Sequence, residues 1–125
     1  MRTVEKLEVA QRAHVLTLEI YRVTTGFPSD ERFGLVAQLR RAASAIGANI
    51  ADGDGGNSNR EFARFLEIAK ASANEVAYHV YLARDLGYLD EDTYQAISSE
   101  ASVIRAMLVK LIRRLRQSSR TKSHP

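Results

Sequence analysis

The feature that most constrains this sequence is the spacing of its apolar residues, which follow one another at alternating steps of three and four. Four stripes have this spacing: Val9, Ala13, Leu16, Ile20 and Val23; Leu35, Leu39, Ala42 and Ile46; Phe62, Leu66, Ala69, Ala73, Val76, Val80 and Ala83; and Tyr94, Ile97, Ala101, Ile104, Leu108, Leu111 and Leu115. Such spacing keeps apolar side chains on one face of an α-helix and is typical of helix-bundle seams. No segment alternates with period two, so no β-strand is predicted.

Turn-forming residues divide the chain into four segments. The breaks fall at residues 25–29, 53–57 and 87–90, and the predicted helices therefore occupy residues 1–24, 30–52, 58–86 and 91–117. Ser58 and Glu61 have capping-box spacing, Gly87 suits the left-handed end of a helix, and Asp90 can cap the next one. Because short connections make neighbouring helices antiparallel, we predict an all-α, up-down-up-down four-helix bundle over residues 5–117. Residues 118–125 are predicted to be a flexible basic tail.

The predicted third helix is apolar on two sides. Ile68, Ala71, Tyr78 and Leu82 lie roughly opposite its main stripe. A helix with two apolar faces has to bury both, and a single small bundle offers a partner for only one. We therefore predict self-association through these four residues. The alternative is that they are ordinary exposed apolar residues beside a wide core stripe.

The second segment contains a run of small residues at 42–51, which includes Gly47. A glycine within a helix costs about 1 kcal/mol relative to alanine. Small side chains let two helix backbones approach closely, and close packing of another helix against Gly47 could offset that cost.

Positive charge is concentrated at the C-terminal end. The chain has 18 Lys and Arg against 15 Asp and Glu, a net charge of +3. Residues 110–125 hold six cations and no acid, so the rest of the chain has a net negative charge. The six cations are Lys110, Arg113, Arg114, Arg116, Arg120 and Lys122. We predict that they bind the phosphate backbone of RNA or DNA, with Arg40 and Arg41 extending the patch. The alternative is a solvated helix end whose cations complement the helix dipole.

Signals for catalysis or for a cofactor are weak. The chain has no cysteine, and its three histidines, His14, His79 and His124, lie outside any known catalytic motif. Glu75 and His79 are spaced i, i+4, but a di-iron bundle would need Glu-x-x-His on two helices. The loop at 52–58 has neither the Gly-Lys-Ser/Thr of a phosphate loop nor the ligand spacing of a calcium loop. We predict a protein that is not an enzyme and has no metal or cofactor.

The N-terminal segment has charges every few residues, and no apolar run approaches the roughly 20 residues that span a bilayer. The expectation from the sequence is a cytoplasmic protein without a membrane partner.

Three longer motifs resemble the bacterial four-helix family of 23S rRNA-intervening-sequence proteins. They are Leu39-Arg40-Arg41-Ala42-Ala43, Ile46-Gly47-Ala48-Asn49-Ile50-Ala51-Asp52-Gly53 and Ser58-Asn59-Arg60-Glu61-Phe62-Ala63-Arg64-Phe65-Leu66. The junction sequences Phe27-Pro28, Glu31-Arg32-Phe33-Gly34-Leu35 and Ala83-Arg84-Asp85-Leu86-Gly87-Tyr88-Leu89 match as well. The resemblance runs from about residue 5 to 117. The loop at 54–57 departs from it, because family members usually carry a more basic loop there.

The resemblance implies a bundle that assembles into ring-like pentamers. The family includes proteins encoded within ribosomal RNA genes and accessory proteins of diversity-generating retroelements, whose basic rings engage nucleic acid and a reverse transcriptase. It therefore implies two functions for this chain: direct binding of nucleic acid, or a scaffold for a partner protein such as a reverse transcriptase without direct contact to nucleic acid.

Overall fold

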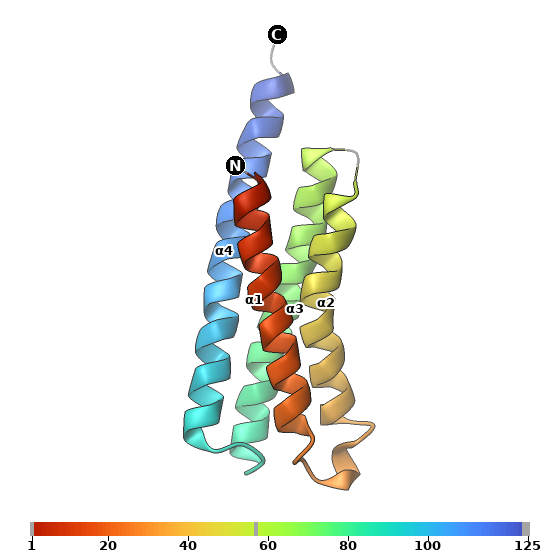
Figure 1. The fold of residues 1–125 in the computed structure, drawn as a ribbon, viewed down its shortest axis with the longest axis vertical. Coiled ribbons are helices and arrows are strands. Elements are labelled where there is room, and N and C mark those ends of the chain that lie inside the picture. The colour runs from red at the N-terminus through yellow and green to blue at the C-terminus, as the bar shows by residue number, and fades with distance from the viewer. Residues whose placement is uncertain (1, 57, 124–125) are drawn as a thin grey trace.

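The computed structural model describes residues 2–56 and 58–123, apart from the side chains of residues 2–5 and 119–123. Four helices dominate it: α1 (Arg2–Thr24), α2 (Leu35–Asp54), α3 (Asn59–Asp85) and α4 (Glu91–Ser123), with a short 3-10 turn η1 (Ser29–Glu31) between the first two. They run up and down side by side (Figure 1). The predicted all-α, antiparallel four-helix bundle is confirmed.

Within the described residues, each helix contacts two neighbours and not the third. The pairs α1·α2, α2·α3, α3·α4 and α1·α4 are in contact, whereas α1 and α3, like α2 and α4, occupy opposite corners of the bundle. The α1–α2 and α3–α4 connections lie at one end of the bundle, and the α2–α3 connection lies at the other (Figure 1). We call the first the double-loop end and the second the α4 end, because α4 finishes there.

The core is made by the residues that the spacing predicts. Every member of the four stripes is buried except Val23 and Tyr94, which pack against the core while partly exposed. Removing apolar side chains from water contributes roughly 25 cal/mol per Å² of buried area, so these stripes supply the main stabilisation of the bundle.

Local capping chemistry fixes the helix ends. The Glu61 amide donates to Ser58 Oγ at 3.1 Å, and the Thr93 amide donates to the Asp90 carboxylate at 2.7 Å. The hydrogen bond from Thr93 lowers the pKa of Asp90, because it favours the ionised form. Gly87 has a φ of +82°, the left-handed conformation predicted for it. Helix α4 continues to Ser123, past residue 117, where the sequence places the end of the bundle.

Gly53, not Gly47, is the glycine of α2 that lies close to another helix. A Cβ on Gly47 would meet nothing within 4 Å, so close packing does not offset the cost of this glycine. A Cβ on Gly53 would lie 2.7 Å from Phe62 Cδ1 and 2.7 Å from Phe65 Cβ. Helices α2 and α3 therefore approach each other closely near their connection, and the absence of a side chain at Gly53 permits this approach.

These two glycines predict opposite effects of the same substitution. Gly47→Ala should raise the free energy of unfolding by up to about 1 kcal/mol, because only helix propensity changes. Gly53→Ala should lower it by roughly 1–3 kcal/mol, because the methyl group has no space. Urea unfolding followed by circular dichroism measures both. A Gly53→Ala variant as stable as the parent would contradict the packing described here.

Candidate nucleic-acid interface

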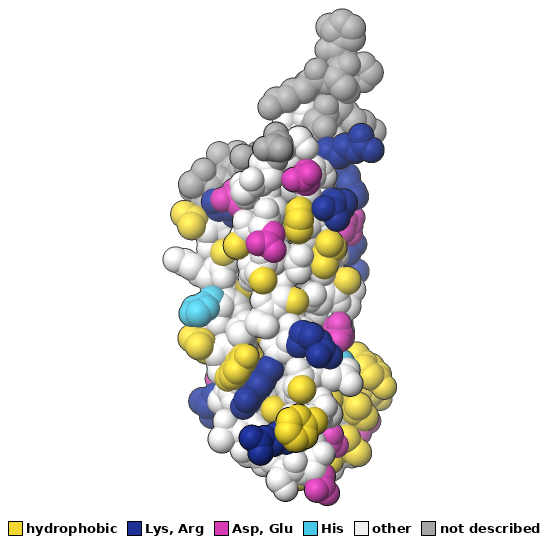
Figure 2. Space-filling view, turned by 90° about the vertical axis from the view of Figure 1, so that its right-hand side faces the viewer, with side chains coloured by type: hydrophobic (Ala, Val, Ile, Leu, Met, Phe, Trp, Pro, Cys, Tyr) yellow, Lys and Arg dark blue, Asp and Glu magenta, His cyan; other side chains and the backbone are white. Residues whose placement is uncertain are grey.

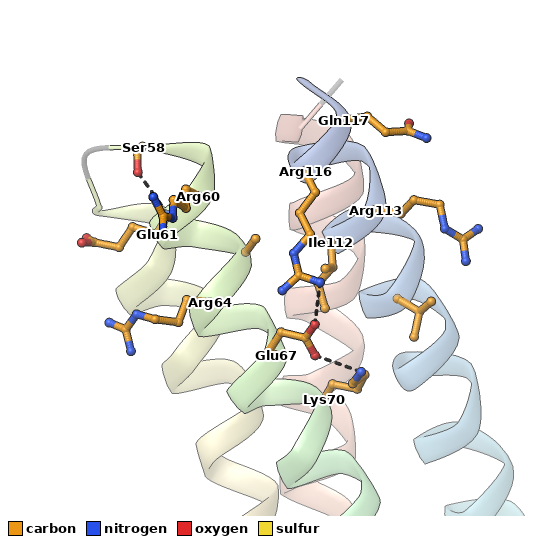
Figure 3. A pocket seen from close by; sticks show the side chains of 12 residues that line it. Ser58, Arg60, Glu61, Arg64, Glu67, Lys70, Ile112, Arg113, Arg116 and Gln117 are labelled. Carbon is orange, nitrogen blue, oxygen red and sulfur yellow. Dashed lines mark hydrogen bonds and ion pairs between the residues drawn. The ribbon is translucent and has the colours of Figure 1, made fainter. Parts of the chain in front are cut away.

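A cleft of about 1010 Å³ opens between the first half of α3 and residues 109–117 of α4, at the α4 end. Its walls carry five cations, Arg60, Arg64 and Lys70 from α3 and Arg113 and Arg116 from α4. Apolar side chains from both helices also line it, namely Ala63, Val109 and Ile112. In Figure 3, Arg116 of α4 reaches toward α3, whereas Arg64 and Arg113 point away to opposite sides. We refer to this feature as the α3–α4 cleft.

One carboxylate links the two walls of the cleft. Glu67 of α3 lies 2.9 Å from Lys70 Nζ on its own helix and 2.9 Å from Arg116 Nη1 on α4 (Figure 3). The hydrogen bond from Lys70, helped by the smaller effect of Arg116, lowers the pKa of Glu67. Glu67 is therefore ionised at neutral pH and offsets part of the positive charge.

The remaining cations of the cleft have no carboxylate partner. Among the described residues, Arg60, Arg64 and Arg113 form no ion pair, although the Arg64 guanidinium lies over the Phe65 ring, 4.7 Å from its centroid. The second acid of the lining, Glu61, likewise forms no ion pair within the described part of the chain. The cleft thus keeps positive charge available to an anion.

The structure brings together part of the predicted basic patch. Arg113 and Arg116 line the cleft, and Lys110 is exposed on the same helix. Arg114 is half-buried and has an interaction of its own. Arg120 and Lys122 lie on the last turns of α4, and their side chains fall outside the described residues.

Arg40 and Arg41 do not extend this patch. They lie in the second turn of α2, near the double-loop end, and α2 makes no contact with α4. The Arg40 side chain is also engaged: Nε donates to Thr24 Oγ1 at 2.9 Å, and the guanidinium lies 4.6 Å from the centre of the Tyr21 ring. The Arg40 side chain therefore connects α2 with α1 through these two interactions.

Sequence reasoning missed the contribution of α3 to the basic surface. Arg60 and Arg64 are spaced i, i+4 and so lie on one face of the helix. An antiparallel hairpin that turns near Tyr88 places this part of α3 beside residues 109–116. That combination of spacing and hairpin geometry was the available signal.

Three of the four residues predicted to mediate self-association are exposed. They are Ile68, Ala71 and Tyr78, the last with 58% of its surface accessible, whereas Leu82 is half-buried and packs partly against the protein's own core. A second apolar face, which sequence analysis did not identify, lies on α1. It consists of Leu7, Val15, Leu18 and Tyr21. Exposed hydrophobic side chains accordingly appear on both lateral edges of the face in Figure 2.

The two histidines in the described part of the chain, His14 and His79, do not come together, and His124 lies outside the described residues. His14 is exposed on α1, whereas His79 is buried on α3, and these two helices do not contact each other. Nδ1 of His79 has no hydrogen-bond partner among the described residues. The same part of the chain contains no group of three or more His, Asp or Glu that could hold a metal ion.

None of the described helices is both long enough and apolar enough to cross a membrane.

The fold and the cleft together define a class, an antiparallel four-helix bundle whose two longest helices form a basic cleft at one end. Within that class, the chain belongs to the 23S rRNA-intervening sequence protein family, whose model matches residues 5–110. The resemblance noted in the sequence is thereby confirmed.

A solved structure has the same architecture. The 1.70 Å crystal structure of a protein of unknown function from the S23 ribosomal protein family of Bacteroides thetaiotaomicron is similar to this chain, with a TM-score of 0.81 and 24% identity. The match covers 87% of this chain and 98% of the other. At that identity the likeness supports the fold alone. No curated protein matches the chain significantly, and neither description above names an enzymatic activity.

Proposed function

We propose that this protein is a non-enzymatic homo-oligomer that binds nucleic acid, RNA in the first place, through the α3–α4 cleft. One observation carries the proposal: cations from two helices line a single cleft, and Arg60, Arg64 and Arg113 have no carboxylate partner among the described residues. Charges held this way attract phosphates without reading bases. The cleft lining contains no aromatic residue, so base stacking is not part of the proposed mechanism.

Salt dependence tests this mechanism. Binding of a fluorescently labelled 20-nucleotide RNA, followed by anisotropy, should weaken about 50-fold between 50 and 200 mM salt if about four phosphates are neutralised on a single strand. The decrease follows from release of counterions, so it should be similar for unrelated sequences. Failure to bind at 50 mM salt would refute the proposal.

The proposed assembly uses the apolar faces of α1 and α3. Because these helices occupy opposite corners of the bundle, each protomer presents two different apolar faces that point in different directions. Contact between the α3 face of one copy and the α1 face of the next is heterologous, and it generates a closed ring when the rotation between copies closes. We propose a ring of five, the number that the sequence resemblance implies. A ring would also repeat the α3–α4 cleft around its axis and so strengthen its field.

A second candidate function is a scaffold for a partner protein without contact to nucleic acid. It is favoured by Phe33 at the double-loop end, which has 88% of its surface accessible. Acidic residues accompany it at this end, and the hydroxyl of Tyr88 joins the two connections there by donating to Glu31 at 3.0 Å. These acids are Asp30, Glu31, Asp85, Asp90, Glu91 and Asp92. A protein interaction whose affinity is unchanged between 50 and 200 mM salt would favour the scaffold.

A further inference from the structure

The Glu67 carboxylate occupies an unusual position in the α3–α4 cleft. It is the one group in the lining that the structure pairs with cations of both walls, at 2.9 Å from Lys70 Nζ and 2.9 Å from Arg116 Nη1. An ammonium and a guanidinium donating to two oxygens of one anion is also how proteins hold a phosphodiester. Figure 3 shows the Glu67 carboxylate between the two cations.

We propose that Glu67 holds the place of a backbone phosphate in the free protein and that an entering strand displaces it. This inference rests on the proposed binding of nucleic acid to the cleft. A phosphate oxygen that takes over Arg116 and Lys70 breaks both ion pairs of Glu67. Glu67 thus competes with the ligand and limits its affinity.

The surroundings of Glu67 make this competition costly for the ligand. About one third of the Glu67 side chain is accessible, whereas Arg116 is more than half accessible. Arg116 can therefore turn toward a ligand, while Glu67 stays at the wall of the cleft. Its negative charge then remains beside the bound phosphate and repels it.

Glu61 offers a matched control. It lines the same cleft and carries the same charge, but it forms no ion pair among the described residues. Replacing either glutamate with glutamine removes one negative charge from the cleft with little change of shape. Only the change at Glu67 also frees Arg116.

The experiment compares Glu67→Gln, Glu67→Ala and Glu61→Gln with the parent chain, using the labelled 20-nucleotide RNA and a salt titration. Both Glu67 variants should bind roughly 5- to 10-fold more tightly, because a local charge is removed and Arg116 is released. Their logarithmic salt slope should stay close to that of the parent, because the same phosphates are neutralised in both complexes and only the competing carboxylate is lost. Glu61→Gln should stay within about 2-fold of the parent, with an unchanged slope.

The outcomes separate this inference from the proposed function. If the parent binds RNA and the Glu67 variants bind equally or more weakly, Glu67 positions Arg116 rather than competing with the ligand, and the inference is overturned while the proposed function stands. If Glu61→Gln raised the affinity for RNA as much as the Glu67 variants, the change in net charge alone would explain the effect, and the inference would also be overturned. If the parent fails to bind RNA, both fail. Circular dichroism of each variant verifies that the helices are intact.

Discussion

Replacing Arg113, Arg114 and Arg116 with glutamate is expected to weaken RNA binding by more than about 100-fold at 100 mM salt. Each substitution removes a cation and adds a repelling carboxylate at the α4 end, and two of the three positions line the α3–α4 cleft. The loss should be measured by anisotropy on the same RNA. Helicity should be preserved, because the ion pair of Arg116 with Glu67 is exposed and pairs of that kind contribute about 0–1 kcal/mol.

A matched triple variant distinguishes the location of charge from its total. Arg22, Arg32 and Arg41 are exposed residues nearer the double-loop end, and their replacement with glutamate changes the net charge by the same amount. Interactions between exposed charges fade beyond about 10 Å at 0.1 M salt, so this control should lose only a few-fold in affinity. Comparable losses in the two triple variants would show that binding responds to overall charge and that the α4 end is not the interface.

The fold was predictable because its stripes of apolar residues are long and regular. The stripe from Phe62 to Ala83 is buried along its whole length, and the caps at Ser58 and Asp90 form as their residue types predict. Both signals depend on neighbours within one or two helical turns, and such neighbours are visible in the sequence.

The cleft was only half predictable, because it depends on which residues of two helices face each other. The charge run that includes Arg113 and Arg116 is contiguous in the sequence, whereas Glu67 meets Arg116 across 49 positions. Arg40 is a second example of a contact that the sequence does not reveal. Its positive charge suggested a phosphate contact, but its side chain donates a hydrogen bond to Thr24 of α1. Packing between Gly53 and the phenylalanines of α3 likewise depends on the depth at which two helices approach each other.

The second large effect is expected at the apolar faces, where Tyr78→Glu on α3 and Leu18→Glu on α1 should each prevent the parent oligomer from forming. A charge at the centre of an apolar interface costs about 2 kcal/mol or more, roughly 30-fold in the dissociation constant of each contact. Light scattering after size exclusion at about 10 µM should give the parent mass as a multiple of 13.9 kDa and each variant as a monomer. Val103→Glu, at an exposed apolar position of α4, is the control and should leave the mass unchanged.

Mixing the two variants reveals how the faces pair. If the α3 face of one copy contacts the α1 face of the next, the Leu18→Glu chain keeps a good α3 face and the Tyr78→Glu chain keeps a good α1 face. An equimolar mixture should then form a dimer of one chain of each kind and grow no further, because the two remaining faces are both charged. If α3 paired with α3 instead, Leu18→Glu would associate on its own and the mixture would contain no such mixed dimer. A parent protein that is monomeric at this concentration would exclude both arrangements. The cleft would then have to bind RNA as a single copy, with a correspondingly smaller salt dependence.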